Sequence, residues 1–181
     1  MTGERTDIAA DAGSVQESDV DAVALDRVGA KLERLASQRK ALRKAMGQFG
    51  EDFDLLEWTR AFDSSNPDDI NRVFTVTGGY LALVNNTAEA IRAGAKPTDL
   101  KPTPGMTGIA GLVDAIRADG GFTSAQAETF TELYRTRNRL QHSSPDMQAD
   151  ELHAQVRLLL GHLPRFVKSY LVWLQTYDVE L

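Results

Sequence analysis

Apolar residues recur every three or four positions along most of the chain, and this spacing constrains the fold more than any other feature. The clearest stripes are Leu25, Val28, Leu32, Leu35, Leu42 and Met46, then Val73, Val76, Tyr80, Leu83, Val84 and Ile91, and finally Leu152, Val156, Leu159, Leu163, Val167, Tyr170, Leu174 and Tyr177. Such spacing gathers apolar side chains on one face of an α-helix, and strand-like alternation is absent. The sequence therefore predicts an all-α bundle of about five to six helices.

The expected helices follow from these stripes and from the turn residues between them. They cover about residues 20–47, part of 49–62, about 67–93, 109–118, a segment from about 123, and about 149–178. The turn "SSNPDD" supplies N-cap chemistry for the third helix, and Thr123 or Ser124 can cap the fifth. We interpret Gly78-Gly79 as a close approach of another helix, and Pro164 should kink the last helix.

Composition defines the broad class of protein. A chain of 181 residues, 42% of them hydrophobic, is long enough for one domain with a core, which we place at residues 20–181. The chain has no cysteine and three histidines, so we expect neither a metal site nor a cofactor. It has no signal peptide and no apolar run of about 20 residues, which predicts a cytoplasmic protein without a membrane segment.

The negative charge is concentrated at the N-terminus. Residues 1–22 contain six carboxylates and one arginine, a balance of −5, so the rest of the chain carries −1 of the net charge of −6. Residues 1–19 are polar and lack a period, which predicts a disordered acidic tail. Residues 131–170 have a balance of +2, which is compatible with a short, local phosphate contact.

The run "RTRNRLQH" (135–142) is the strongest candidate for a functional site. The buried stripe of its helix runs through Phe130, Leu133, position 137 and Leu140, so an arginine occupies a position where an apolar residue is expected. A guanidinium there is costly without a partner or a polar cleft. Arg135 and Arg139 lie off this stripe, and we expect them to be solvated.

His142 follows Arg137 by five residues. On a continuing helix it would point about 140° away from Arg137. The sequence "SSPD" after it disfavours continuation, because Pro145 biases Ser144 away from the helical region. A histidine at such a helix end can turn back toward Arg137. We expect the other two histidines, His153 and His162, at the surface or an interface, and Trp58 and Trp173 in packing roles.

"RNRLQH" (137–142) is an R-N-x-x-x-H motif and resembles the signature of HEPN domains, in particular their HepT-like branch. The order of a short helix ending in glycine, a helix closed by the motif, an acidic turn and a long final helix is similar to the C-terminal half of that family. The resemblance covers about residues 22–177. It implies an endoribonuclease toxin of a toxin–antitoxin or phage-defence system that cleaves RNA without a metal, as a homodimer.

The resemblance also assigns roles to residues. It implies that Arg137 holds the scissile phosphate, that His142 acts as general base or acid, and that Asn138 orients the pair, with weaker RNA contacts from Arg135 and Arg139. Many HepT-like toxins have a tyrosine two residues after the histidine, which a nucleotidyltransferase antitoxin modifies with AMP. Ser144 stands there, so a nucleotidyltransferase partner would need another target or would act by complex formation.

Two other functions remain open at this point. The chain could be a non-catalytic HEPN module that binds a nucleotidyltransferase or another protein, with Arg137 paired to a carboxylate at a dimer interface. It could also be a regulatory or nucleotide-binding bundle without turnover.

Overall fold

The computed structural model describes the backbone of residues 12–142 and 147–177, and the side chains from residue 28 onward within these ranges. This part of the chain forms six α-helices and one short 3-10 helix, and it contains no strand. In chain order they are α1 (Ala12–Met46), η1 (Gly47–Phe49), α2 (Leu55–Phe62), α3 (Pro67–Ala95), α4 (Gly108–Ala118), α5 (Ser124–His142) and α6 (Ala149–Gln175). The predicted all-α bundle is confirmed.

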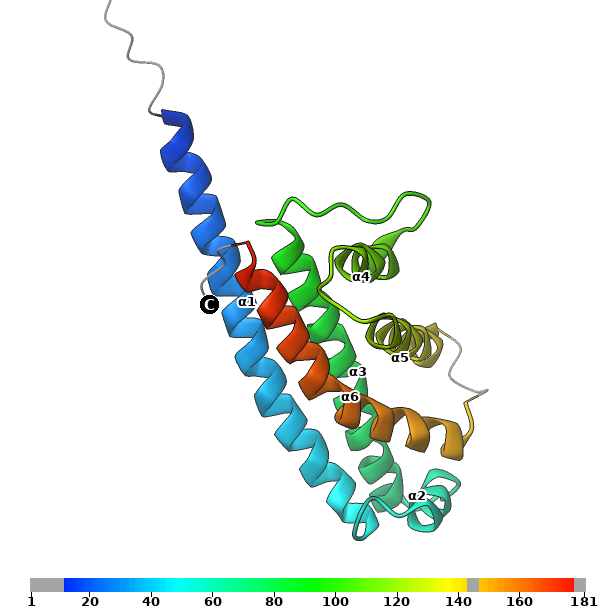
Figure 1. Ribbon diagram of the computed structural model, residues 1–181. Helices are drawn as coiled ribbons and strands as arrows, with labels where there is room; N and C mark the ends of the chain where they lie inside the picture. The colour runs from blue at the N-terminus through cyan, green and yellow to red at the C-terminus, as the bar shows by residue number, and fades with distance from the viewer. Residues whose placement is uncertain (1–11, 143–146, 178–181) are drawn as a thin grey trace, which may run out of the picture.

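Three long helices form the body of the molecule. Figure 1 shows α1, α3 and α6 running along its long axis, with α4 and α5 on one side of α3 and α2 at the end where α1 and α3 are joined. α6 bends along its length and remains a helix through Pro164, in line with the predicted kink. No helix in the described ranges is both long and apolar enough to cross a membrane.

The observed helix bounds differ from the predicted ones mainly at the N-terminus. α1 begins at Ala12, so residues 12–19, which we predicted to be disordered, are helical. The remainder of the predicted tail, residues 1–11, lies outside the described residues.

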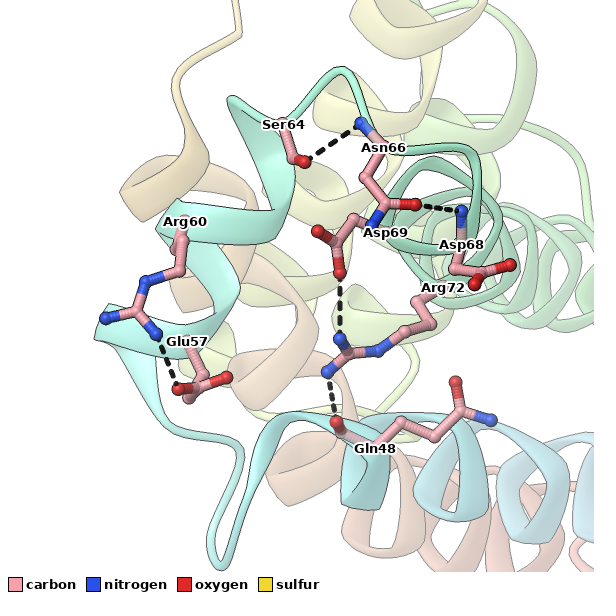
Figure 2. A network of polar contacts seen from close by, with 8 residues as sticks. All are labelled: Gln48, Glu57, Arg60, Ser64, Asn66, Asp68, Asp69 and Arg72. Atoms are coloured by element: carbon pink, nitrogen blue, oxygen red, sulfur yellow. Dashed lines mark hydrogen bonds and ion pairs between the residues drawn. The ribbon is translucent and has the colours of Figure 1, made fainter.

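The turn before α3 is built by side chains that satisfy the free N–H groups of the helix start. Asn66 is the N-cap, and its Oδ1 accepts a hydrogen bond of 3.0 Å from the backbone N–H of Asp68. Figure 2 shows this cap beside Arg72, which binds Asp69 on its own helix and the Gln48 carbonyl oxygen of η1. This network joins the end of α1 to the start of α3. At α5, the predicted cap is Thr123, whose Oγ1 accepts from the Gln126 N–H at 3.2 Å.

The two glycines in α3 have different surroundings. A Cβ on Gly79 would lie 3.0 Å from Leu42 Cδ1, so this glycine lets α1 approach closely, as predicted. A Cβ on Gly78 would meet nothing within 4 Å, and Gly78 is exposed. The close approach therefore explains only Gly79.

The core consists of two clusters. One lies toward the α1–α2 end and includes Leu42, Phe49, Trp58 and Leu133. The other lies around α4 and the second half of α6 and includes Ile116, Phe130, Phe166 and Trp173. Both tryptophans are buried and donate to oxygen, Trp58 to the Ala149 carbonyl and Trp173 to the Asp119 carboxylate, each at 2.7 Å, so their predicted packing roles are confirmed. Tyr134 of α5 packs against both clusters.

Candidate functional site

Arg137 lies at the edge of the buried face of α5. The buried residues of this helix are Ala127, Phe130, Leu133 and Thr136, spaced by three. The expectation that position 137 continues the buried stripe is therefore wrong by one residue, because Thr136 fills that place with no exposed surface. Arg137 is half-buried beside it.

Neutral groups hold the Arg137 guanidinium. Its Nε donates to Asn85 Oδ1 on α3, and its Nη1 donates to Asn138 Oδ1 at 2.7 Å. Its Cζ lies 5.4 Å from the centre of the Tyr134 ring, within the range of a cation–π contact. Among the described residues no carboxylate forms an ion pair with Arg137, so its positive charge is oriented but not compensated.

Tyr134 connects Arg137 to a second arginine. Its hydroxyl oxygen accepts a hydrogen bond of 3.3 Å from Nη2 of Arg92, which projects from α3. Asn85 and Arg92 are two helical turns apart, so they lie on the same side of α3. Two polar residues of α3 thus face the motif residues of α5.

His142 is the last residue of α5 and is exposed. It follows Asn138 by four residues, which places both on one face of the helix. No hydrogen bond or ion pair within the described residues joins His142 to Arg137. α5 is helical as far as His142, and Ser143, Ser144 and Pro145, on which the predicted helix end rests, lie outside the described residues. The structure brings Arg137 and Asn138 together and leaves His142 apart.

The two flanking arginines both form ion pairs. Arg139 makes a two-pronged contact with Glu151 of α6, in which Nη2 lies 3.1 Å from Oε2. Arg135 is exposed and lies 3.9 Å from Glu132. Both charges are thus shared with carboxylates, unlike that of Arg137.

The other histidines are less exposed than we predicted. His153 is buried, its Nε2 lies 2.6 Å from the Phe53 carbonyl oxygen, and its ring stacks on Phe53 with centroids 4.4 Å apart. His162 is half-buried, and desolvation lowers its pKa below the usual value. The surface prediction is wrong for His153, whose imidazole packs on Phe53 like an aromatic ring. His162 is only partly covered, with its ring centroid 5.6 Å from that of Phe166.

Sequence reasoning missed Asn85, Tyr134 and Arg92. The spacing of Asn85, Glu89 and Arg92, four and then three residues apart, does mark a polar side of α3 opposite its apolar stripe. Nothing in the sequence shows that this side meets α5, because that contact depends on how the two helices cross. Tyr134 precedes Arg137 by three residues, a spacing that permits contact on one helix.

An apolar cavity of about 360 Å³ lies near the end of α5. Its lining residues come from four helices and the segment before α6: Ala61, Phe62, Ile70, Val73, Phe74, Thr77, Leu140, Met147 and Leu152. Phe74 is 68% exposed, which is unusual for a phenylalanine on a helix. This apolar surface is suited to contact with another protein chain.

Comparisons of the chain with protein-family models, with curated proteins and with solved structures find no match.

Proposed function

We propose that this protein is a HEPN-type endoribonuclease toxin of a toxin–antitoxin or phage-defence system, which cleaves RNA without a metal at a site shared by two copies of the chain. The observation that supports this most directly is the Arg137 guanidinium, which is held by Asn85 and Asn138 and forms no ion pair with a carboxylate of the described residues. An arginine fixed by neutral acceptors keeps donors and charge for an anion, and a phosphodiester matches the planar fork of a guanidinium.

The proposed chemistry transfers two protons. Arg137 binds the non-bridging oxygens of the scissile phosphate and stabilises the charge that develops on them. One imidazole takes the proton of the 2′-hydroxyl, whose oxygen forms a bond to phosphorus. A second imidazole gives a proton to the 5′-oxygen as the phosphorus–oxygen bond to it breaks. The products are a 2′,3′-cyclic phosphate and a 5′-hydroxyl, so no water or metal is needed in this step.

One chain does not supply an arginine and two imidazoles at the same place. His142 points about 140° away from Arg137 on the same helix, and no contact joins them within the described residues. A second copy would add another His142 to the site. The apolar surface around Phe74 and Leu140, close to the end of α5, supports such an association.

A cleavage assay on purified protein tests the proposal. Labelled RNA is incubated with wild type, Arg137→Ala, Asn138→Ala and His142→Ala in the presence of EDTA. We expect wild type to cleave, Arg137→Ala and His142→Ala to lose about 100-fold or more in rate, and Asn138→Ala to lose less.

Two matched controls come from the chain itself. Gln141→Ala changes an exposed neighbour of His142, and Arg117→Ala removes an arginine that is ion-paired to Asp114 on α4. Both should cleave like wild type. The nuclease proposal fails if wild type leaves tRNA, mRNA and single-stranded oligonucleotides intact in this assay.

The second candidate is a non-catalytic HEPN module that binds a protein partner such as a nucleotidyltransferase. The cavity beside Phe74 favours it, because an exposed phenylalanine next to an apolar cavity is typical of a protein-binding surface. Under this alternative, Phe74→Asp abolishes capture of the partner, while Arg137→Ala has no effect on it.

A further inference from the structure

Five side chains form a continuous series of contacts that leads away from the Arg137 site. In order they are Lys31 of α1, Glu89 and Arg92 of α3, and Tyr134 and Arg137 of α5; we call them the polar row. Lys31 Nζ lies 3.5 Å from Glu89 Oε2, Arg92 Nη1 lies 2.8 Å from Glu89 Oε1, and Arg92 Nη2 donates to the Tyr134 hydroxyl at 3.3 Å. Arg137 then lies over the Tyr134 ring.

The polar row differs from the ordinary ion pairs of the surface. Most ion pairs in the described chain join residues three apart on one helix, such as Arg60 with Glu57. The polar row contains one such pair, Glu89 with Arg92, but its other contacts cross from α1 to α3 and from α3 to α5, and it ends at the proposed catalytic arginine. Its charged side chains beyond Arg137 stay accessible, with 30% of Lys31, 48% of Glu89 and 43% of Arg92 exposed.

The polar row has the composition of a single-strand binding surface. It contains three cations, one carboxylate and one aromatic ring, so its net charge is positive although that of the whole chain is negative. Cations that follow a phosphate backbone, with aromatic rings among them, are typical of proteins that bind single-stranded nucleic acid.

We propose that the polar row binds the RNA strand that flanks the scissile phosphate, with Arg92 and Lys31 contacting successive phosphates away from Arg137. This inference rests on the proposed function for the identity of the ligand. In this proposal α1 and α3 also bind the substrate, through residues that lie outside the motif on α5.

Glu89 has a specific role in this arrangement. It bonds both Lys31 and Arg92, so it holds the two cations in place and also competes with phosphate for them. Replacing Glu89 with glutamine removes the competing charge and keeps the shape. RNA binding should then become stronger, whereas loss of a merely structural ion pair would not improve it.

The test measures binding separately from cleavage. Fluorescence anisotropy follows a labelled 12-nucleotide single-stranded RNA as protein is added, on a His142→Ala background so that the RNA stays intact. The variants are Arg92→Gln, Lys31→Gln and Glu89→Gln, with Arg117→Gln as the control because Arg117 is also ion-paired on its own helix. Each is measured over a range of salt concentrations, and cleavage by chains that keep His142 is measured in parallel.

We expect Arg92→Gln and Lys31→Gln to weaken binding several-fold and to reduce the slope of log K against log salt by about 0.7 for each phosphate that the variant no longer neutralises. Glu89→Gln should tighten binding several-fold, and Arg117→Gln should match its parent. The inference is overturned if Arg92→Gln and Lys31→Gln keep the parent affinity and slope, or if Glu89→Gln weakens binding. If the affinities of the variants change as expected but wild type does not cleave RNA, the nuclease proposal is rejected and the polar row is retained as an RNA-binding surface.

Discussion

Two arginines of this protein are packed in nearly the same way and differ in the groups that hold them. Arg72, at the start of α3, lies 4.4 Å from the centre of the Phe49 ring, and Arg137, near the end of α5, lies 5.4 Å from that of Tyr134. Arg72 binds the Asp69 carboxylate at 2.9 Å and the Gln48 carbonyl, as Figure 2 shows. Arg137 binds only the amide oxygens of Asn85 and Asn138 among the described residues.

The difference separates a structural arginine from one available for a ligand. Asp69 compensates the charge of Arg72 alone, whereas Lys31 and Arg92 share the single carboxylate of Glu89. Arg72 therefore ties α3 to η1 and has little attraction left for an anion. The amides fix the orientation of the Arg137 guanidinium and leave its charge intact. Orientation without compensation is what stabilisation of a phosphate in a transition state requires.

Exchanging each arginine for alanine should have opposite consequences, and this is the largest effect we predict. Arg137→Ala should lower the rate of RNA cleavage about 100-fold or more with little change in stability. Arg72→Ala should lower the free energy of unfolding by about 1–2 kcal/mol and leave the cleavage rate unchanged. Cleavage assays and urea denaturation on both variants check this. If only Arg137→Ala lost stability, Arg72 would not be the structural arginine of the two.

A single substitution can make the Arg137 site resemble that of Arg72. Asn85→Asp places a carboxylate at the Nε of Arg137 and should reduce cleavage by about tenfold, because the new charge competes with phosphate for the guanidinium. Stability should be kept or rise by up to about 1 kcal/mol. Asn86→Asp is the matched control, since Asn86 bonds Gln38 of α1 rather than Arg137. If both variants lost activity equally, the cause would be the added negative charge on α3 and not the compensation of the Arg137 charge.

Inorganic phosphate should distinguish the two arginines without RNA. A ligand at about five times its Kd stabilises the folded state by about 1 kcal/mol. We expect phosphate to raise the melting temperature of wild type and Arg72→Ala, but not of Arg137→Ala, compared with chloride at equal ionic strength. An equal rise in all three proteins would place the phosphate elsewhere.

The smallest effect concerns Asp69. Asp69→Asn leaves Arg72 without its carboxylate and removes an acidic side chain from the first turn of α3, where it interacts favourably with the helix dipole. The free energy of unfolding should fall by about 0.5–1 kcal/mol, with cleavage unchanged. Denaturation midpoints measure this. No change in stability would show that the Arg72 network does not stabilise the junction of α1 and α3.

The sequence was sufficient to predict the helices, apart from the start of α1, and to single out Arg137, Asn138 and His142 as candidate residues. Periodicity and caps located α3, α4, α5 and α6 to within a few residues, because these features are local. The start of α1 was missed because its first residues have a polar, disorder-like composition and no apolar period.

The missed parts of the site depend on contacts between helices. A motif can single out Arg137, Asn138 and His142, since they are close in sequence. Asn85, the partner of Arg137 on α3, lies 52 residues earlier in the chain, and only the crossing of α3 with α5 brings the two together. The shift of the buried stripe from position 137 to Thr136 has the same origin, because packing between helices decides which neighbouring residue is covered.

The most direct test of the account uses a dimer in which only one chain is intact. Wild-type chain and Arg137→Ala/His142→Ala chain are expressed with different tags, purified as a heterodimer and assayed for RNA cleavage. A site shared by both chains loses one of its two imidazoles, so we predict a rate about 100-fold below wild type. A heterodimer that retains half of the wild-type rate would contradict the account, because each chain would then carry a complete site of its own.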